Sequence, residues 1–129
     1  MSKVYYAHHI YKYGTLVEEY EMNLIRRYYP DAEIINPATA VNQDLQSEAD
    51  IMGQCFDLVD QSDFLIFSSM DGVVGKGVYD EIHRAAATQT PIYYIQFDQI
   101  VPVDNIGATQ RIENPRSNRF YANVVYNEI

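Results

Sequence analysis

Four short apolar runs, separated by longer stretches with helical periodicity, constrain this chain more than any other feature. The runs are KVYYA (3–7), AEIIN (32–36), DFLIFS (63–68) and PIYYIQF (91–97). They are rich in aromatic and β-branched residues, which favour strands. The third run is almost continuously apolar, as is typical of a strand buried on both faces of a parallel sheet. The sequence therefore predicts interior strands of an α/β domain.

The gaps between these runs carry apolar residues at helical spacing, which predicts three helices. The stripes are Leu16, Tyr20, Leu24 and Tyr28; then Ala49, Met52, Phe56 and Val59; and then Val78, Ile82, Ala85 and Ala86. Thr15 and Glu18 have the spacing of a capping box at the start of the first helix, and Pro30 marks its end.

Strands that alternate with helices predict an open, mainly parallel sheet with helices on both faces. We expect one three-layer α/β/α domain over 1–129, Rossmann- or flavodoxin-like, with five strands in the order 2-1-3-4-5. The fifth strand is expected at 119–126, after an irregular, polar segment 98–118. In this order the ends of strands one and three border the crevice where ligands bind.

Charge and composition narrow the range of partners. The net charge of −9 is the wrong sign for a polymeric nucleic acid, so a small ligand is expected instead. No apolar stretch approaches the length of a membrane span, and the first residues have no signal-peptide pattern. A single cysteine, Cys55, allows no intrachain disulfide, which favours a reducing, cytoplasmic location.

The stretch SMDGVVGKGVYDEI (69–82) is the strongest candidate for a functional loop. Its glycines match neither the phosphate-binding P-loop nor the dinucleotide fingerprint. Glu81 falls about one turn into the expected helix, where the helix dipole favours an ionised carboxylate. Gly77, four residues earlier on the same face, would let a ligand approach that carboxylate, which could attack an electrophilic carbon. The alternative is an exposed glutamate that only complements the dipole.

Five segments together resemble the nucleoside 2-deoxyribosyltransferase family and the related nucleotide N-glycosidase-like domains. They are VYYA, NPA, SDFLIF, GKGVYDEIHRAA and NPRSNRFYANVVY, in this order along nearly the whole chain. The resemblance implies that Glu81 is the nucleophile at the anomeric carbon and that Tyr5 hydrogen-bonds it. It also implies that Asn105, or else Asp104, contacts the sugar in the neighbouring subunit's pocket, and that Tyr126 helps to close that pocket. A homo-oligomer with shared sites is therefore expected.

The chain departs from the family pattern at two positions that grip the substrate. Cys55 stands where the family usually has an aspartate, with Asp57 close by as a substitute, and Gly75 stands where it has Asp or Ser. Asp71 could reach in from further up the loop, as a catalytic residue. These departures leave the choice of substrate open.

The histidines His8 and His9 follow the first strand, where relatives of the family often carry small residues, and we expect both to bind substrate. The leaving base needs a proton, for which Asp71, Asp57 and either histidine are candidates. The alternative is a solvated or structural pair. No metal ligand spacing is evident, and the reaction requires no cofactor.

The sequence is compatible with three functions. One is an enzyme that transfers or hydrolyses at the N-glycosidic bond of a nucleoside, with a free base as second substrate. A second is a nucleoside 5′-monophosphate N-glycosidase. A third is a domain of the same fold that binds a nucleotide derivative without turnover. A phosphotransfer receiver is excluded, because YYAHH and LIFSS supply no acidic cluster.

Overall fold

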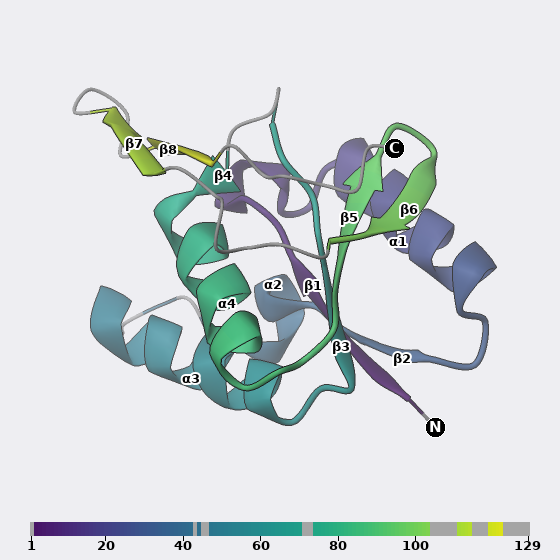
Figure 1. Cartoon of the computed structure of the whole chain (residues 1–129), viewed down its shortest axis with the longest axis horizontal. Coiled ribbons are helices and arrows are strands. Elements are labelled where there is room, and N and C mark those ends of the chain that lie inside the picture. Colours follow the sequence, from purple (N-terminus) through teal and green to yellow (C-terminus); the bar gives the residue numbers. More distant parts are fainter. Residues whose placement is uncertain are drawn as a thin grey trace.

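A mainly parallel five-stranded sheet forms the centre of the molecule, in the order β2-β1-β3-β5-β6 (Figure 1). The computed structural model describes residues 2–42, 44, 47–70, 74–103, 111–114 and 119–122. The strands of this sheet are β1 (Lys3–Ala7), β2 (Glu33–Ile35), β3 (Phe64–Phe67), β5 (Ile92–Gln96) and β6 (Gln99–Pro102). The first four are parallel, and β6 is antiparallel to β5. The predicted architecture and the 2-1-3-4-5 order, counted along the chain, are confirmed.

The fifth strand of the sheet comes from a different segment than the sequence predicts. It is β6, whose first residue Gln99 lies in the stretch expected to be irregular. The backbone reverses at Phe97, which has a positive φ of 57°, so the chain returns at once beside β5. The expected strand at 119–126 contributes β8 (Arg119–Ala122) to a separate antiparallel sheet with β4 (Val74–Gly75) and β7 (Arg111–Asn114).

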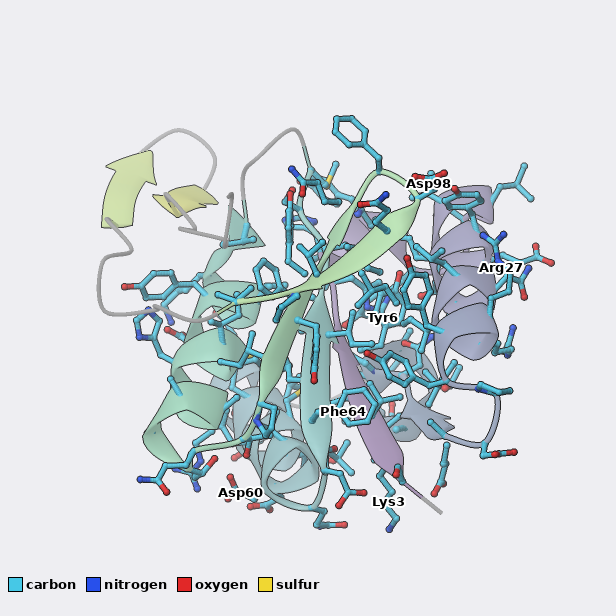
Figure 2. All side chains as sticks on the ribbon, turned by 45° about the vertical axis from the view of Figure 1, so that its right-hand side comes forward. Lys3, Tyr6, Arg27, Asp60, Phe64 and Asp98 are labelled. Carbon is cyan, nitrogen blue, oxygen red and sulfur yellow. The ribbon has the colours of Figure 1, made fainter. Side chains whose placement is uncertain are left out.

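Helices cover both faces of the central sheet (Figure 1). They are η1 (Ile10–Lys12), α1 (Leu16–Tyr28), α2 (Pro37–Ala40), α3 (Glu48–Asp60) and α4 (Lys76–Ala87). Because side chains alternate along a strand, Tyr5 and Ala7 of β1 pack with α3 and α4, whereas Val4 and Tyr6 pack with α1. Figure 2 shows Tyr6 and Phe64 on the α1 side of the sheet.

The buried face of α1 differs from the predicted stripe. Leu24 is buried as expected, but Leu16 is 82% exposed, and the charged Glu21 is buried instead. The carboxylate of Glu21 accepts hydrogen bonds from Lys12 Nζ (2.9 Å), Ser68 Oγ (2.7 Å) and the Tyr6 hydroxyl (2.5 Å). Because these partners hold Glu21 against the sheet, Leu16 and Val17 in the first turn of the helix face outward.

The termini of α1 follow the sequence prediction. The helix starts after Thr15, whose Oγ1 accepts from the backbone N–H of Glu18 at 3.3 Å. The Glu18 carboxylate accepts from the backbone N–H of Gly14 at 3.2 Å, one residue before the atom expected for a capping box. These two hydrogen bonds hold the start of α1 and the preceding Gly14 in place. Most of the segment between β1 and α1 lines a cavity.

Candidate functional site

A cavity of about 530 Å³ lies beyond the carboxyl end of β1. Three segments line it: the stretch that follows β1, the inner face of α3, and the first turns of α4. Their lining side chains include His9, Tyr13, Met52, Cys55 and Glu81. The cavity therefore lies at the end of the sheet where the sequence predicted a ligand crevice, with the glycine loop's helix as one wall.

Glu81 is the buried acidic group of this cavity. It belongs to the inward face of α4 together with Val78, Ile82 and Ala85, and only 4% of it is exposed. The helix begins at Lys76 after Gly75, so Glu81 lies in its second turn, close to the predicted place. The alternative of an exposed glutamate that merely complements the helix dipole is wrong.

Tyr5 and Cys55 surround the Glu81 carboxyl group. The hydroxyl of Tyr5, a fully buried residue of β1, donates a hydrogen bond to Glu81 Oε2. The thiol of Cys55, on α3, lies within hydrogen-bonding reach of both groups. Burial raises the pKa of Cys55 to about 11 and raises that of Tyr5 far above its ordinary value, so both groups keep their protons. The carboxylate therefore meets two neutral potential donors.

Burial also raises the pKa of Glu81, from 4.5 to about 7, against the effect of the hydrogen bonds from Tyr5 and Cys55. The sequence predicted that the helix dipole would favour the ionised form. The larger effect is desolvation, which disfavours a charge inside the protein. Near neutral pH, Glu81 can therefore exist as an ionised nucleophile or as a neutral acid, and the balance shifts with small changes around it.

Gly77 lines the same cavity as Glu81, and the position has room for a small side chain. A Cβ placed on Gly77 would meet only Met52 Sδ, at the ordinary contact distance of 3.5 Å. The other flank of the helix start is crowded, because a Cβ on Gly75 would lie 2.7 Å from Cδ2 of His9. Gly75 lines the cavity, and its lack of a side chain leaves room for the imidazole of His9.

The two histidines have different positions. His8 is buried and stacks on Tyr6, with ring centroids 3.8 Å apart. Its Nδ1 lies 3.0 Å from the carbonyl oxygen of Tyr6, and its Nε2 lies 2.7 Å from Glu18 Oε2. Because both ring nitrogens are engaged within the protein, His8 holds the wall in place, although it borders the cavity. His9 is partly buried and faces the cavity from the same segment.

The remaining predicted site residues lie elsewhere. Asp57 is exposed on α3, near Arg84, and does not line the cavity. Asp71, Asn105 and Tyr126 lie outside the described residues. Within the described ranges, no group of three or more His, Cys, Asp or Glu is arranged to hold a metal ion. No helix in the same ranges has the length and hydropathy of a membrane span.

Several lining residues were not predicted from the sequence. Tyr13 and Tyr11 line the cavity from the segment after β1, and Met52 and Glu48 line it from α3. The tyrosines could have been found from the sequence, because YKYG (11–14) follows closely after the predicted strand that ends at the crevice. Burial raises the pKa of the Tyr13 hydroxyl above its ordinary value, so this group is a donor. Together these residues give the cavity a largely aromatic and apolar rim above its acidic floor.

Comparison of the sequence with protein-family models and with curated proteins finds no match. Among solved structures, the fold is similar to a conserved protein from Enterococcus faecalis V583, with a TM-score of 0.59 and 22% sequence identity. The similarity covers 73% of this chain but only 62% of that protein's chain. At this identity the likeness supports the α/β fold and leaves the activity to be argued from the cavity.

Proposed function

We propose that this protein cleaves or transfers at the N-glycosidic bond of a 2′-deoxynucleoside, with Glu81 as the nucleophile. The observation that carries the proposal is the buried Glu81 carboxyl group, held by Tyr5 at the floor of a cavity of about 530 Å³. A carboxylate in this setting suits a reaction at a sugar carbon that develops positive charge. The sequence resemblance to the nucleoside 2-deoxyribosyltransferase family supports the same role for both residues.

The proposed reaction has two displacements. In the first, an oxygen of ionised Glu81 bonds to C1′, and the bond from C1′ to the base nitrogen breaks with its electron pair going to the base. The base then takes a proton. In the second, a free base or water attacks C1′ and loses a proton, and the ester bond breaks to restore the Glu81 carboxylate. No cofactor enters this scheme.

The charges around the cavity favour an uncharged nucleoside over a monophosphate. Among the described lining residues, Lys76 is the cationic side chain of the α4 start, and its Nζ lies 3.5 Å from Asp80 Oδ2. Its side chain is about half exposed. A phosphate would compete with Asp80 for this lysine and would lie close to the acidic Glu81. Hydrolysis of a nucleoside 5′-monophosphate therefore has less support.

A binding domain without turnover is the second candidate function, and the raised pKa of Glu81 favours it. Below pH 7 the neutral carboxyl group can donate a hydrogen bond to a base or sugar and has little nucleophilic character. This candidate also agrees with the absence of the family's aspartate at Cys55 and of its Asp or Ser at Gly75.

The two candidates are separated by incubation of the protein with 2′-deoxynucleosides and a second free base. Base exchange that disappears in Glu81→Gln, with a deoxyribosyl adduct on Glu81 in the mass spectrum of the wild type, supports the enzyme. Tight nucleoside binding by calorimetry, with no exchange and no adduct at any pH from 6 to 9, supports the binding domain and refutes the enzyme.

We further propose that the protein works as a dimer or larger homo-oligomer. Ile10 and Tyr11 at the cavity rim, and Leu16 and Val17 at the start of α1, are exposed apolar side chains close together in the chain. Such side chains commonly mark an interface with another protein. Light scattering that gives only the monomer mass would contradict this part of the proposal.

A further inference from the structure

Contacts within the protein hold the backbone and the ring of Tyr13, the residue that follows η1. Its N–H donates to the carbonyl oxygen of Ile10 at 3.0 Å, and its ring packs against the imidazole of His8 with ring centroids 4.9 Å apart. The preceding Lys12 is buried, and its ammonium group donates three hydrogen bonds of 2.9 Å. Tyr13 is therefore held in place in the cavity wall before any ligand binds.

The hydroxyl of Tyr13 is the part of this side chain that the protein does not engage. The hydroxyls of Tyr5, Tyr6 and Tyr94 each form a hydrogen bond with another side chain. In the described part of the chain, no group donates to the Tyr13 hydroxyl or accepts from it. A tyrosine hydroxyl that is withdrawn from bulk water usually has a partner. In a cavity of this size, such a group is suited to bind and orient a ligand.

The hydroxyl lies within electrostatic reach of the proposed nucleophile. Burial raises the pKa of Tyr13, and among the neighbouring groups Glu81 raises it most, followed by Cys55 and Glu18. The Tyr13 hydroxyl therefore keeps its proton near neutral pH, and it serves the same side of the cavity as the Glu81 carboxyl group. A neutral donor at this position can bind an oxygen of the sugar without competing for the positive charge that develops at C1′.

The stereochemistry of a nucleoside decides which sugar oxygen this donor meets. In a natural 2′-deoxynucleoside the base and C5′ lie on one face of the sugar ring, and the 3′-hydroxyl lies on the other. A nucleophile that displaces the base must attack from the face opposite the base. Glu81 therefore approaches the face that carries the 3′-hydroxyl, and a donor beside Glu81 meets the 3′-hydroxyl before the 5′-hydroxyl.

We propose that the Tyr13 hydroxyl donates a hydrogen bond to the 3′-hydroxyl of the substrate and makes the cavity selective for sugars that carry this group. This inference rests on the proposed N-glycosidic function. The hydrogen bond fixes the sugar over Glu81, so it helps to hold C1′ in line with the carboxylate. A site that is built to pair with a substrate hydroxyl discriminates against the analogue that lacks it.

A cycle between one protein hydroxyl and one substrate hydroxyl tests this contact. Tyr13→Phe keeps the ring on His8 and removes only the hydroxyl. Base exchange is measured for both proteins with a 2′-deoxynucleoside and with its 2′,3′-dideoxy and 2′,5′-dideoxy analogues. We expect Tyr13→Phe to lower kcat/KM by about 3- to 10-fold for the first and third substrates, as for a hydrogen bond between neutral groups. For the 2′,3′-dideoxy analogue the two proteins should agree within about 2-fold.

The comparison isolates the contact, because both proteins act on the same analogue and its altered intrinsic reactivity cancels. If the wild type does not turn over an analogue, the same cycle is measured as Kd by calorimetry in Glu81→Gln, with and without Tyr13→Phe, and the same criteria apply. Tyr28→Phe, at an exposed tyrosine of α1, is the matched control and should leave all three substrates unchanged. Circular dichroism and thermal unfolding check that each variant is folded.

Three results would overturn the inference alone. An equal loss with all three substrates would show that the Tyr13 hydroxyl acts on the base or on the cavity wall. A loss that disappears only with the 2′,5′-dideoxy analogue would assign the hydroxyl to the other end of the sugar. Full activity of Tyr13→Phe with every substrate would show that it binds none of them. By contrast, a wild-type protein that exchanges no base with any of the four natural 2′-deoxynucleosides, and forms no adduct on Glu81, overturns the proposed function and the inference with it.

Discussion

The burial of Glu81 should appear as a pH-dependent cost in folding stability, and Glu81→Gln measures it without any assumption about substrate. In the unfolded chain the carboxyl group ionises near its ordinary pKa of 4.5, whereas in the folded protein its pKa is raised to about 7. Between these values the unfolded state has released its proton and the folded state still holds it. The free energy of unfolding of the wild type therefore falls as pH rises through this interval.

The size of the effect follows from the two pKa values. A pKa difference of one corresponds to about 1.4 kcal/mol, so the interval from 4.5 to about 7 gives about 3 kcal/mol. Glutamine has a similar shape and no charge to desolvate, and it escapes this loss. We expect Glu81→Gln to gain about 3 kcal/mol relative to the wild type as pH rises from 4.5 to 7, and the gain to stay constant above pH 7.

Urea unfolding of both proteins at intervals from pH 4.5 to 8.5 gives this difference directly. A pH-independent difference in unfolding free energy between the two proteins reports how well the amide fits beside Tyr5. The test is therefore the change of this difference with pH. Glu33→Gln, at an exposed carboxylate of β2, is the matched control and should change stability by no more than about 0.5 kcal/mol. A flat difference between wild type and Glu81→Gln across the range would refute the reasoning that burial dominates at this site.

Three other substitutions have definite expected outcomes. Tyr5→Phe removes a hydrogen-bond donor to the ionised form of Glu81, so the pKa of Glu81 should rise further, by about one to two. The pH profile of activity, or a carboxyl infrared titration, should shift upward, and an unchanged profile would contradict the role of Tyr5. Lys12→Met leaves the buried Glu21 carboxylate without its cation and should lower the free energy of unfolding, measured with urea, by about 3–5 kcal/mol. Adding Glu21→Gln should recover most of this loss, and equal stabilities of the single and double variants would contradict the pairing. Gly77→Ala should keep the free energy of unfolding or raise it by up to about 1 kcal/mol, because alanine favours the helix. Its methyl group should fill part of the cavity that Glu81 also lines and weaken nucleoside binding in calorimetry, and unchanged binding would show that the ligand does not approach Gly77.

The sequence was sufficient for the fold because its strongest patterns are local. The four residues of β3, FLIF, are all apolar because β3 is covered on both faces, and the alternation of such runs with helices restricts the sheet to few orders. The fifth strand was missed because the hairpin that forms β6 turns at Phe97–Asp98. Such turns usually carry Asn-Gly or a similar pair, and Phe97–Asp98 contains neither glycine nor asparagine, so its signal for a reversal is weak.

The candidate site was predictable only in part. Glu81 and Gly77 follow from helical spacing, and Tyr5 follows from the family resemblance. The rotation of α1 could not be predicted, because it depends on Glu21 meeting Ser68, 47 residues away in the chain. The pairing of His9 with Gly75 is of the same kind. Each residue alone appears as a departure from a family pattern, and only the close approach of their atoms relates the two departures to each other.

The proton-bearing groups around the cavity lead to a simple expectation for the pH dependence of the proposed reaction. Burial keeps Tyr5, Tyr13 and Cys55 protonated near neutral pH. Glu81 then changes charge in the middle of the range, and it attacks only when ionised. We expect kcat/KM to rise with pH to a plateau, with a midpoint of about 7 and no descending limb below pH 9. A bell-shaped profile would require a proton donor in addition to these groups, and it would direct attention to Asp71, which lies outside the described residues.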